Sequence, residues 1–130
     1  MATTTATINI ASADLTDNAL NITNTATLNK KGNLEGLDTI ISATKTFTSG
    51  SAADLVAIAG FDALAANKVY IANTGTSESD YFTIGIESEE IGRLYGGDWM
   101  FIPWDASSGD DITIQPSVAT AMTAEYMVFS

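Results

Sequence analysis

The feature that most constrains the fold of this chain is a strict alternation of apolar and polar residues near its beginning. In residues 5–11 and 19–28, the apolar residues Ala6, Ile8, Ile10, Leu20, Ile22, Ala26 and Leu28 alternate with Thr5, Thr7, Asn9, Asn21, Thr23, Thr25 and Thr27. Successive side chains of a β-strand point to opposite faces, so an alternation with period two is typical of a half-buried strand. The pattern predicts two such strands, joined by a polar turn over residues 12–18.

Short runs of β-branched and aromatic residues, separated by turn signals, continue through the rest of the chain. We expect strands at residues 39–48, 55–59, 68–73, 81–86, 89–95, 99–102, 111–115 and 121–129. The last run is apolar on both faces, which predicts a central position in a sheet or a position at an interface. About eight to ten strands in 130 residues indicate an all-β protein, a β-sandwich or jelly-roll-like fold, with a single domain over residues 1–130. Residues 1–28 contain no aromatic side chain, and we expect them to form an extended arm or edge strands.

Three local predictions are more specific. Residues 51–66 mix helix-favouring Ala and Leu with strand-like residues, and we expect a strand at 55–59 followed by a short helical turn at 62–66. In the strand over residues 89–95, Ile91 is expected to point inward. The Gly96-Gly97-Asp98 sequence predicts a turn or a β-bulge, because glycine tolerates a positive φ.

Large aromatic residues are concentrated between Lys68 and Trp104, and both tryptophans fall in this window. Aromatic side chains bury the largest apolar area per residue, so we expect the core to form around this part of the chain.

Charge and composition exclude several classes of function. The chain has 16 acidic and 5 basic residues, a formal net charge of −11, which would repel nucleic acid and supplies no polybasic membrane anchor. It has no histidine and no cysteine, so zinc catalysis, Ser–His chemistry and disulfides are not available to it. We therefore expect no enzymatic activity, no metal, no cofactor, no nucleic-acid partner and no membrane partner.

The beginning of the sequence, MATTTATINI, lacks the basic segment and continuous apolar run of a secretory signal. No stretch approaches the ~20 consecutive apolar residues of a membrane-spanning helix. We expect a soluble protein that is made in a cytoplasm and is not secreted through a signal peptide.

Two acidic clusters are candidate sites: Glu87, Glu89 and Glu90 with Asp98, and Asp105 with Asp110 and Asp111. Neither has the ligand spacing of a calcium loop, and no base or nucleophile accompanies a carboxylate pair. We interpret both clusters as solvated turns and edges. Arg93, the only arginine, is expected to form an ion pair with Glu89, Glu90 or Asp98.

Tyr95, Trp99 and Trp104 permit a carbohydrate-binding interpretation, because flat aromatic rings can stack on sugars. Aromatic residues in the strands of a small sandwich more often pack in the core or contact another subunit. Both interpretations of these three residues stay open at this point.

Several sequence segments together resemble a known group of proteins. These are KVYIANTGTSESDYFTIGI, EEIGRLYGGDWMFIPW, the C-terminal AEYMVFS, and the opening ATINIASADLTDNALNITNTATLNKKGNLEGLD. The chain resembles small virion structural proteins of tailed bacteriophages, in particular those of phages that infect marine cyanobacteria and other aquatic bacteria. The resemblance covers nearly the whole chain and implies a β-sandwich subunit used in many copies, without catalytic residues.

We therefore expect a capsid decoration (cement) protein on the outer surface of a phage head, with copies of itself and the major capsid protein as partners. A tail, neck or fibre-associated subunit and a carbohydrate-binding adhesion module are the alternatives. The residues expected to contact a partner are Thr5, Thr7, Asn9, Thr23, Thr25, Lys30 and Lys31, because Thr-rich strand faces with few charges suit packing and the two lysines can meet an acidic surface. A face that contacts only solvent is the alternative for the threonine-rich strands.

Overall fold

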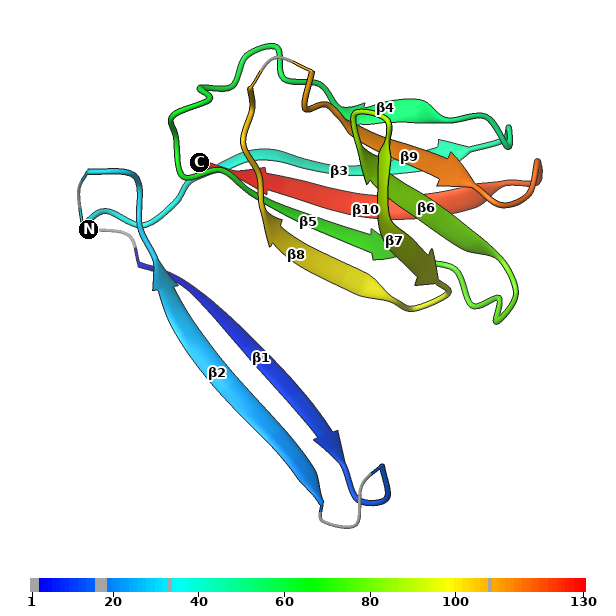
Figure 1. The fold of residues 1–130 in the computed structure, drawn as a ribbon, viewed down its shortest axis with the longest axis horizontal. Helices are drawn as coiled ribbons and strands as arrows, with labels where there is room; N and C mark the ends of the chain where they lie inside the picture. Colours follow the sequence, from blue (N-terminus) through cyan, green and yellow to red (C-terminus); the bar gives the residue numbers. More distant parts are fainter. Residues whose placement is uncertain (1–2, 16–18, 33, 108) are drawn as a thin grey trace. The chain divides into compact units, whose positions relative to one another are not determined.

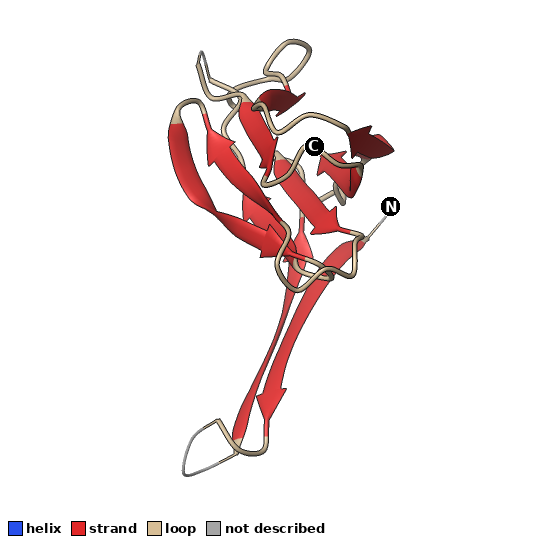
Figure 2. Ribbon diagram, turned by 90° about the vertical axis from the view of Figure 1, so that its right-hand side faces the viewer, coloured by secondary structure: helices blue, strands red, loops and turns tan. Residues whose placement is uncertain are grey.

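The computed structural model describes residues 3–15, 19–32, 34–107 and 109–130. These residues form ten strands and no helix (Figures 1 and 2). The strands are β1 (Thr4–Ser12), β2 (Leu20–Leu28), β3 (Thr39–Phe47), β4 (Ala53–Val56), β5 (Lys68–Asn73), β6 (Tyr81–Ile86), β7 (Glu89–Tyr95), β8 (Trp99–Pro103), β9 (Ile112–Pro116) and β10 (Met122–Phe129). The chain divides into two compact units, Met1–Asp38 and Thr39–Ser130.

The first unit is a long antiparallel hairpin with a short loop after it. Strands β1 and β2 pair along nine residues each, with Thr4 opposite Leu28 and Ser12 opposite Leu20, and form a sheet of their own. The predicted turn that joins them includes residues 16–18, which lie outside the described residues. After β2, Asn29 forms an isolated bridge with Gly36.

The second unit is a β-sandwich made of two four-stranded antiparallel sheets, with the strand orders β3-β10-β5-β8 and β4-β9-β6-β7. Among these eight strands, only β6 and β7 are consecutive members of one sheet, and every other connection crosses to the opposite sheet. Crossing connections of this kind give the strand order of a jelly roll. The prediction of an all-β, jelly-roll-like sandwich is confirmed. Strand β10 is central in its sheet, as its two apolar faces predicted.

The core of the sandwich lies between these two sheets. Phe82 of β6 is fully buried and meets Phe47 of β3 edge to face, with 5.6 Å between the ring centroids. Ile71, Ile84, Ile112, Ile114 and Val128 are also buried almost completely. Many of the core residues come from the window between Lys68 and Trp104, where the sequence predicted the core to form.

Two local predictions were wrong. Ile91 is 47% exposed, not inward, because it lies three residues from the buried Leu94 and therefore on the other side of β7; it is also the residue left without a pairing partner where the register with β6 shifts beside Gly85. The strand predicted at 55–59 lies instead at Ala53–Val56, and two hydrogen-bonded turns come after it, Phe61 N to Ile58 O and Ala65 N to Asp62 O. The second turn occupies the position where a short helical turn was expected, but the structure contains no helix there.

Gly96 allows the β7–β8 turn to approach the β5–β6 loop closely. A Cβ atom at this position would lie 2.6 Å from Ser77 O and 2.7 Å from Ser77 N, both of which are backbone atoms. The sequence prediction of a turn at Gly96-Gly97-Asp98 is confirmed, with a hydrogen bond from Asp98 N to Tyr95 O of 2.9 Å.

We expect Gly96→Ala to lower the free energy of unfolding by about 1–3 kcal/mol, because the extra methyl group forces two backbone segments apart. Chemical denaturation at constant pH measures the change. Gly92→Ala is the matched control, since a Cβ atom there meets no heavy atom within 4 Å. Equal effects of the two substitutions would contradict the close approach at Gly96.

Candidate interaction surfaces

The residues predicted to contact a partner on the hairpin share one face. Asn9 stands opposite Thr23, and Thr7 opposite Thr25. The Thr7 and Thr25 hydroxyls are hydrogen bonded at 2.8 Å, and the Thr23 hydroxyl donates to Asn9 Oδ1 at 3.2 Å. We call this surface the threonine face; its residues are Thr5, Thr7, Asn9, Asn21, Thr23, Thr25 and Thr27, and all are exposed.

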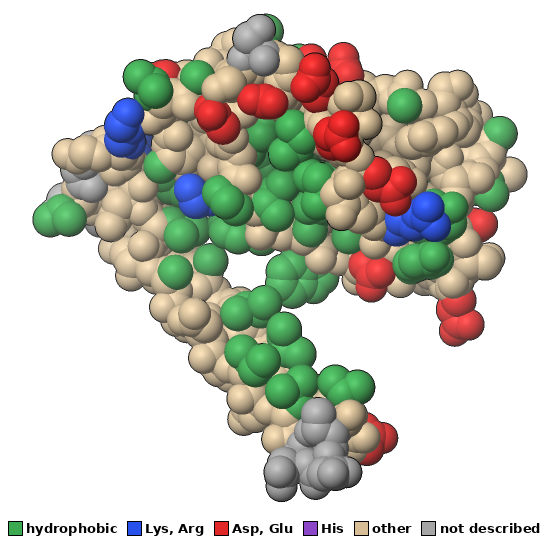
Figure 3. Space-filling view, viewed as in Figure 1, with side chains coloured by type: hydrophobic (Ala, Val, Ile, Leu, Met, Phe, Trp, Pro, Cys, Tyr) green, Lys and Arg blue, Asp and Glu red, His purple; other side chains and the backbone are tan. Residues whose placement is uncertain are grey.

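The opposite side of the hairpin is apolar and also exposed. Ile8, Ile10 and Ile22 are 41%, 46% and 49% exposed, respectively. We call this surface the apolar face; its apolar residues are Ala6, Ile8, Ile10, Leu20, Ile22, Ala26 and Leu28, and the register places Thr4, Ser12 and Asn24 on the same side. Figure 3 shows hydrophobic side chains in a row along the hairpin. A two-stranded hairpin alone is marginally stable in water, so an uncovered apolar face of this length is a candidate contact surface.

The two adjacent lysines that were predicted to contact a partner, Lys30 and Lys31, have different surroundings in the loop after β2. Lys30 Nζ lies 2.6 Å from Asp38 Oδ2, so its charge is paired within its own unit. The hydrogen bond to Asp38 raises the pKa of Lys30 above its ordinary value of 10.5. The ion pair is therefore fully present below pH 10.5 and is lost only as the pH rises through the raised pKa. Lys31 is exposed beside Gly32, which has a φ of +81°. Lys31 is therefore the better placed of the two lysines to meet an external acidic group.

The three aromatic residues that are candidates for sugar stacking do not form one surface. Trp104 is 3% exposed; it packs edge to face on Phe61 at 5.1 Å and donates Nε1–H to Asp110 O at 2.7 Å. Trp104 is thus a core residue and does not belong to a stacking platform. Tyr95 and Trp99 are 39% and 52% exposed, but they belong to β7 and β8, which lie in different sheets.

Trp99 belongs to a larger aromatic surface that was not predicted from the sequence. On the outer side of the sheet β3-β10-β5-β8, Tyr70 stands opposite both Phe101 and Met127. The Tyr70 and Trp99 rings are 6.4 Å apart, and Phe101 meets Phe129 at 6.3 Å. We call this surface the aromatic face; its residues are Tyr70, Trp99, Phe101, Met127 and Phe129. The sequence does carry one signal for this surface, because β5, β8 and β10 have apolar residues on both faces. The strand order that brings these strands together is not visible in the sequence.

Three acidic residues of the two candidate clusters, Glu90, Asp98 and Asp111, have structural partners. Asp98 Oδ2 accepts a hydrogen bond from Tyr95 N, and Asp111 Oδ1 accepts one from Ile58 N. Arg93 pairs with Glu90 at 3.1 Å, which confirms the predicted ion pair, and its guanidinium lies 4.9 Å from the Tyr81 ring centroid. Within the described ranges, no group of three or more His, Cys, Asp or Glu side chains is placed to hold a metal ion.

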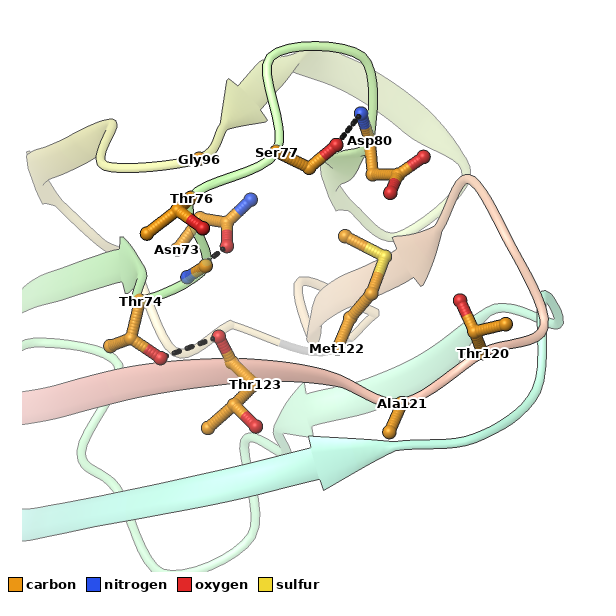
Figure 4. A pocket seen from close by; sticks show the side chains of 11 residues that line it. Asn73, Thr74, Thr76, Ser77, Asp80, Gly96, Thr120, Ala121, Met122 and Thr123 are labelled. Carbon is orange, nitrogen blue, oxygen red and sulfur yellow. Dashed lines mark hydrogen bonds between the residues drawn. The ribbon is translucent and has the colours of Figure 1, made fainter.

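A hollow of about 420 Å³ opens beside the β5–β6 loop and the start of β10 (Figure 4). Its polar groups are largely bonded to one another: Thr74 Oγ1 donates to Thr123 O at 3.0 Å, and Ser77 Oγ accepts from Asp80 N at 3.1 Å. Asn73 Oδ1 accepts from Gly75 N. Asp80 is the one carboxylate among the lining residues. The hollow therefore presents no base and nucleophile pair, and its groups serve the loop itself.

A second hollow, of about 350 Å³, lies between the 63–68 segment and the end of β8. Asn67 lines it and is 1% exposed; its Nδ2 donates to Asp62 O, while its Oδ1 has no hydrogen-bond partner among the described residues. The remaining lining consists of three alanines, Lys68, Pro103, Trp104 and Asp105, and the Lys68 ammonium group donates to Ala66 O at 2.9 Å. One buried acceptor in such a setting specifies no ligand.

No protein-family model matches the chain, and the searches of curated proteins and of solved structures found no significant match. In the part of the chain that the structure describes, there is no helix with the length and apolar character needed to cross a membrane.

Proposed function

We propose that the protein is a non-enzymatic structural subunit of a virion, specifically a capsid decoration protein that bridges neighbouring major capsid subunits. The observation that carries the proposal is the hairpin β1–β2, whose strands contain no charged residue and whose threonine and apolar faces are both exposed. A free-standing protein gains little from such a ribbon, whereas a subunit of an assembly can bury both faces against neighbours.

Further observations support a role in a virion. The proposal starts from the expectation, based on the sequence segments quoted above, of a small structural protein of a tailed phage. The jelly roll is a fold used by viral capsid domains, although it also occurs in lectins and does not determine function by itself. The sandwich carries 12 of the 16 acidic residues, which suits a soluble outer surface on an assembly of many copies.

In this proposal the threonine face and the 29–38 loop contact the capsid. Hydroxyl groups already bonded in pairs, such as Thr7 with Thr25, retain acceptor sites for backbone N–H groups of a partner. Lys31 adds attraction to an acidic capsid surface. Each copy stabilises a joint between capsid subunits by its buried area, at about 25 cal/mol per Å² of apolar surface, and the effect accumulates over many copies.

Imaging of labelled protein on intact particles tests the location. Label spread over the head supports the decoration role, whereas label confined to the tail identifies a tail, neck or fibre-associated subunit. A chain that is never found on particles would refute the virion proposal in both forms.

The hairpin is expected to be required for attachment to particles. Deletion of residues 1–38, or the shorter deletion of 1–28, should abolish binding, because the remaining sandwich lacks the threonine face. Pelleting of particles with bound protein measures the loss. The control is a thermal melt of the truncated chain, which should stay folded since the core cluster lies wholly within residues 39–130. Full occupancy by the truncated protein would contradict the assignment.

One observation favours a second candidate, a carbohydrate-binding adhesion module. Trp99 is half exposed, and its ring is inclined by 36° to that of Tyr70, so an apolar sugar face can stack there. A glycan array followed by fluorescence titration tests it. Trp104 is buried, so a bound sugar should change only the emission of Trp99, and Trp99→Phe should remove the response. The absence of any glycan response rejects this candidate.

A further inference from the structure

A carboxylate borders the aromatic face on the outer side of the sheet β3-β10-β5-β8. Glu125 of β10 pairs with Ala72 of β5, and Ala72 pairs in turn with Trp99 of β8, so these residues form one row across the sheet. Tyr70 stands two residues from Ala72 on the same side, and its ring lies 6.4 Å from that of Trp99 at an angle of 36°. In this row, the methyl group of Ala72 is all that stands between the Glu125 side chain and the Trp99 ring.

No cation of the described chain lies within ion-pair distance of the Glu125 carboxylate. Neither of the two ion pairs among the described residues includes it, and no hydrogen bond joins its side chain to another of those residues. Lys68 is the other charged residue that the strands place on this side, but it is four residues from Ala72 along β5, ~13 Å away. Its ammonium group donates to Ala66 O at 2.9 Å. The Glu125 carboxylate is therefore available to an external cation.

The other sheet contains the same combination of groups with a cation in place. Tyr81 and Tyr95 form an aromatic pair there, with 5.1 Å between the ring centroids. The Arg93 guanidinium lies 4.9 Å from the Tyr81 ring centroid, and its Nε is 3.1 Å from Glu90 Oε1. The outer side of β3-β10-β5-β8 has an aromatic pair and a carboxylate but no arginine. The comparison points to a guanidinium as the group that completes it.

We propose that Trp99, Tyr70 and Glu125 bind an exposed arginine side chain of a partner protein. A guanidinium is planar and weakly hydrated, so it can stack on the Trp99 ring while its edge donates hydrogen bonds to the Glu125 carboxylate. The charge of the carboxylate and the negative faces of the aromatic rings both attract a cation. The net charge of −11 adds a long-range attraction to the same kind of partner.

The partner is a different protein, because a second copy of this chain has no arginine to offer. Arg93 is the only arginine of the sequence, and its guanidinium is already engaged with Glu90 and Tyr81. Two copies with a net charge of −11 each also repel one another. The inference goes beyond the proposed function and does not rest on it, since that proposal places the capsid contacts on the hairpin and the 29–38 loop.

A titration of the purified full-length chain with short peptides tests the proposal. The probe is the peptide Gly-Arg-Gly with both ends blocked, and its matched control replaces arginine with citrulline, which has nearly the same shape but no charge. NMR follows the indole N–H signals of the two tryptophans separately. We expect the Trp99 signal to shift and saturate with the arginine peptide, and to respond about tenfold more weakly to citrulline. Trp104 is 3% exposed and its N–H is bonded to Asp110 O, so its signal should not move.

Two substitutions that remove the same charge separate a local contact from general attraction. Glu125→Gln keeps the shape of the side chain and should weaken binding of the arginine peptide about tenfold, without changing the response to citrulline. Glu90→Gln removes one negative charge from the other sheet and should change the affinity by less than about twofold. Trp99→Leu, followed through the backbone N–H signal of Ala72, should also lose binding while the chain keeps its thermal unfolding transition, because the Trp99 ring is 52% exposed.

Four results would overturn the proposal. An unshifted Trp99 signal would exclude the site, and equal responses to arginine and citrulline would show that the charge of the ligand does not matter. Equal losses for Glu125→Gln and Glu90→Gln would reduce the effect to a general attraction of cations. Equal affinity for a Gly-Lys-Gly peptide would show that the site does not select arginine. If a neutral sugar shifts the Trp99 signal and the arginine peptide does not, Trp99 belongs to the carbohydrate candidate instead.

Discussion

Replacement of Phe82 by alanine is expected to lower the free energy of unfolding by about 3–5 kcal/mol, the largest effect that we expect of a single substitution. Phe82 is completely buried, and its ring meets Phe47 from the opposite sheet at 5.6 Å. Its loss removes buried apolar area and leaves a cavity between two sheets that cannot both move inward. Urea denaturation followed by fluorescence measures the change.

Tyr95→Ala is the control for Phe82→Ala. Tyr95 is an aromatic residue of the same sheet, but it is 39% exposed and its main ring contact is Tyr81 at 5.1 Å. Its replacement should cost at most about 1.5 kcal/mol, the upper value for an aromatic pair. If both substitutions had the same effect, the placement of Phe82 at the centre of the core would be wrong.

Replacement of Asn73 by alanine is expected to cost about 2–4 kcal/mol, because it removes both hydrogen bonds of a buried amide. The Asn73 side chain is 3% exposed; its Nδ2 donates to Leu94 O at 2.9 Å and its Oδ1 accepts from Gly75 N at 2.9 Å. Leu94 belongs to the opposite sheet, so this amide joins the two layers where β5 ends. Chemical denaturation of the variant measures the loss.

Asn73→Asp separates the two hydrogen bonds. It keeps an acceptor for Gly75 N but places a carboxylate against the carbonyl oxygen of Leu94, so we expect a loss at least as large as that of Asn73→Ala. A cost of less than about 0.5 kcal/mol for Asn73→Ala would mean that the amide does not hold the sheets together, since a typical net hydrogen bond is worth at least that much.

The two faces of the hairpin illustrate how far a sequence pattern can be interpreted. The alternation predicted that Thr7 and Asn9 share a face of β1, and that Thr23 and Thr25 share a face of β2. Within one strand, every second side chain points to the same side, so this prediction needs only neighbouring residues. Whether the polar faces of β1 and β2 lie on the same side depends on their register. The pairing of Thr7 with Thr25 brings them together, and it also places all seven apolar residues on the other side.

The aromatic residues show where local reasoning ends. Trp99 and Trp104 lie five residues apart with similar neighbours, yet one is 52% exposed and the other 3%. Their difference arises from the surroundings of each side chain: Trp99 stands on the outer side of β8, whereas Trp104 comes after the end of that strand and packs under the 58–67 segment on Phe61. A separation of five residues places two side chains on opposite faces of an extended segment, but the strand order decides which of those faces is buried.

The prediction for Ile91 was wrong for a related reason. Ile91 lies three residues from Leu94, and residues three apart on a strand point to opposite faces, so only one of the two can be inward. The pairing with β6 places Leu94 opposite the buried Phe82, and Ile91 is left on the outer side.

The local properties of this protein are encoded in short stretches of its sequence: strands in place of helices, one polar and one apolar face on each early strand, and a chain without histidine, cysteine or a basic patch. The jelly-roll strand order, the aromatic face assembled from β5, β8 and β10, and the burial of Trp104 emerge only in the folded chain. The physical reason is that strand pairing is non-local. Strands β3 and β10 are joined by hydrogen bonds across most of the sandwich sequence, and no window of neighbouring residues contains that information.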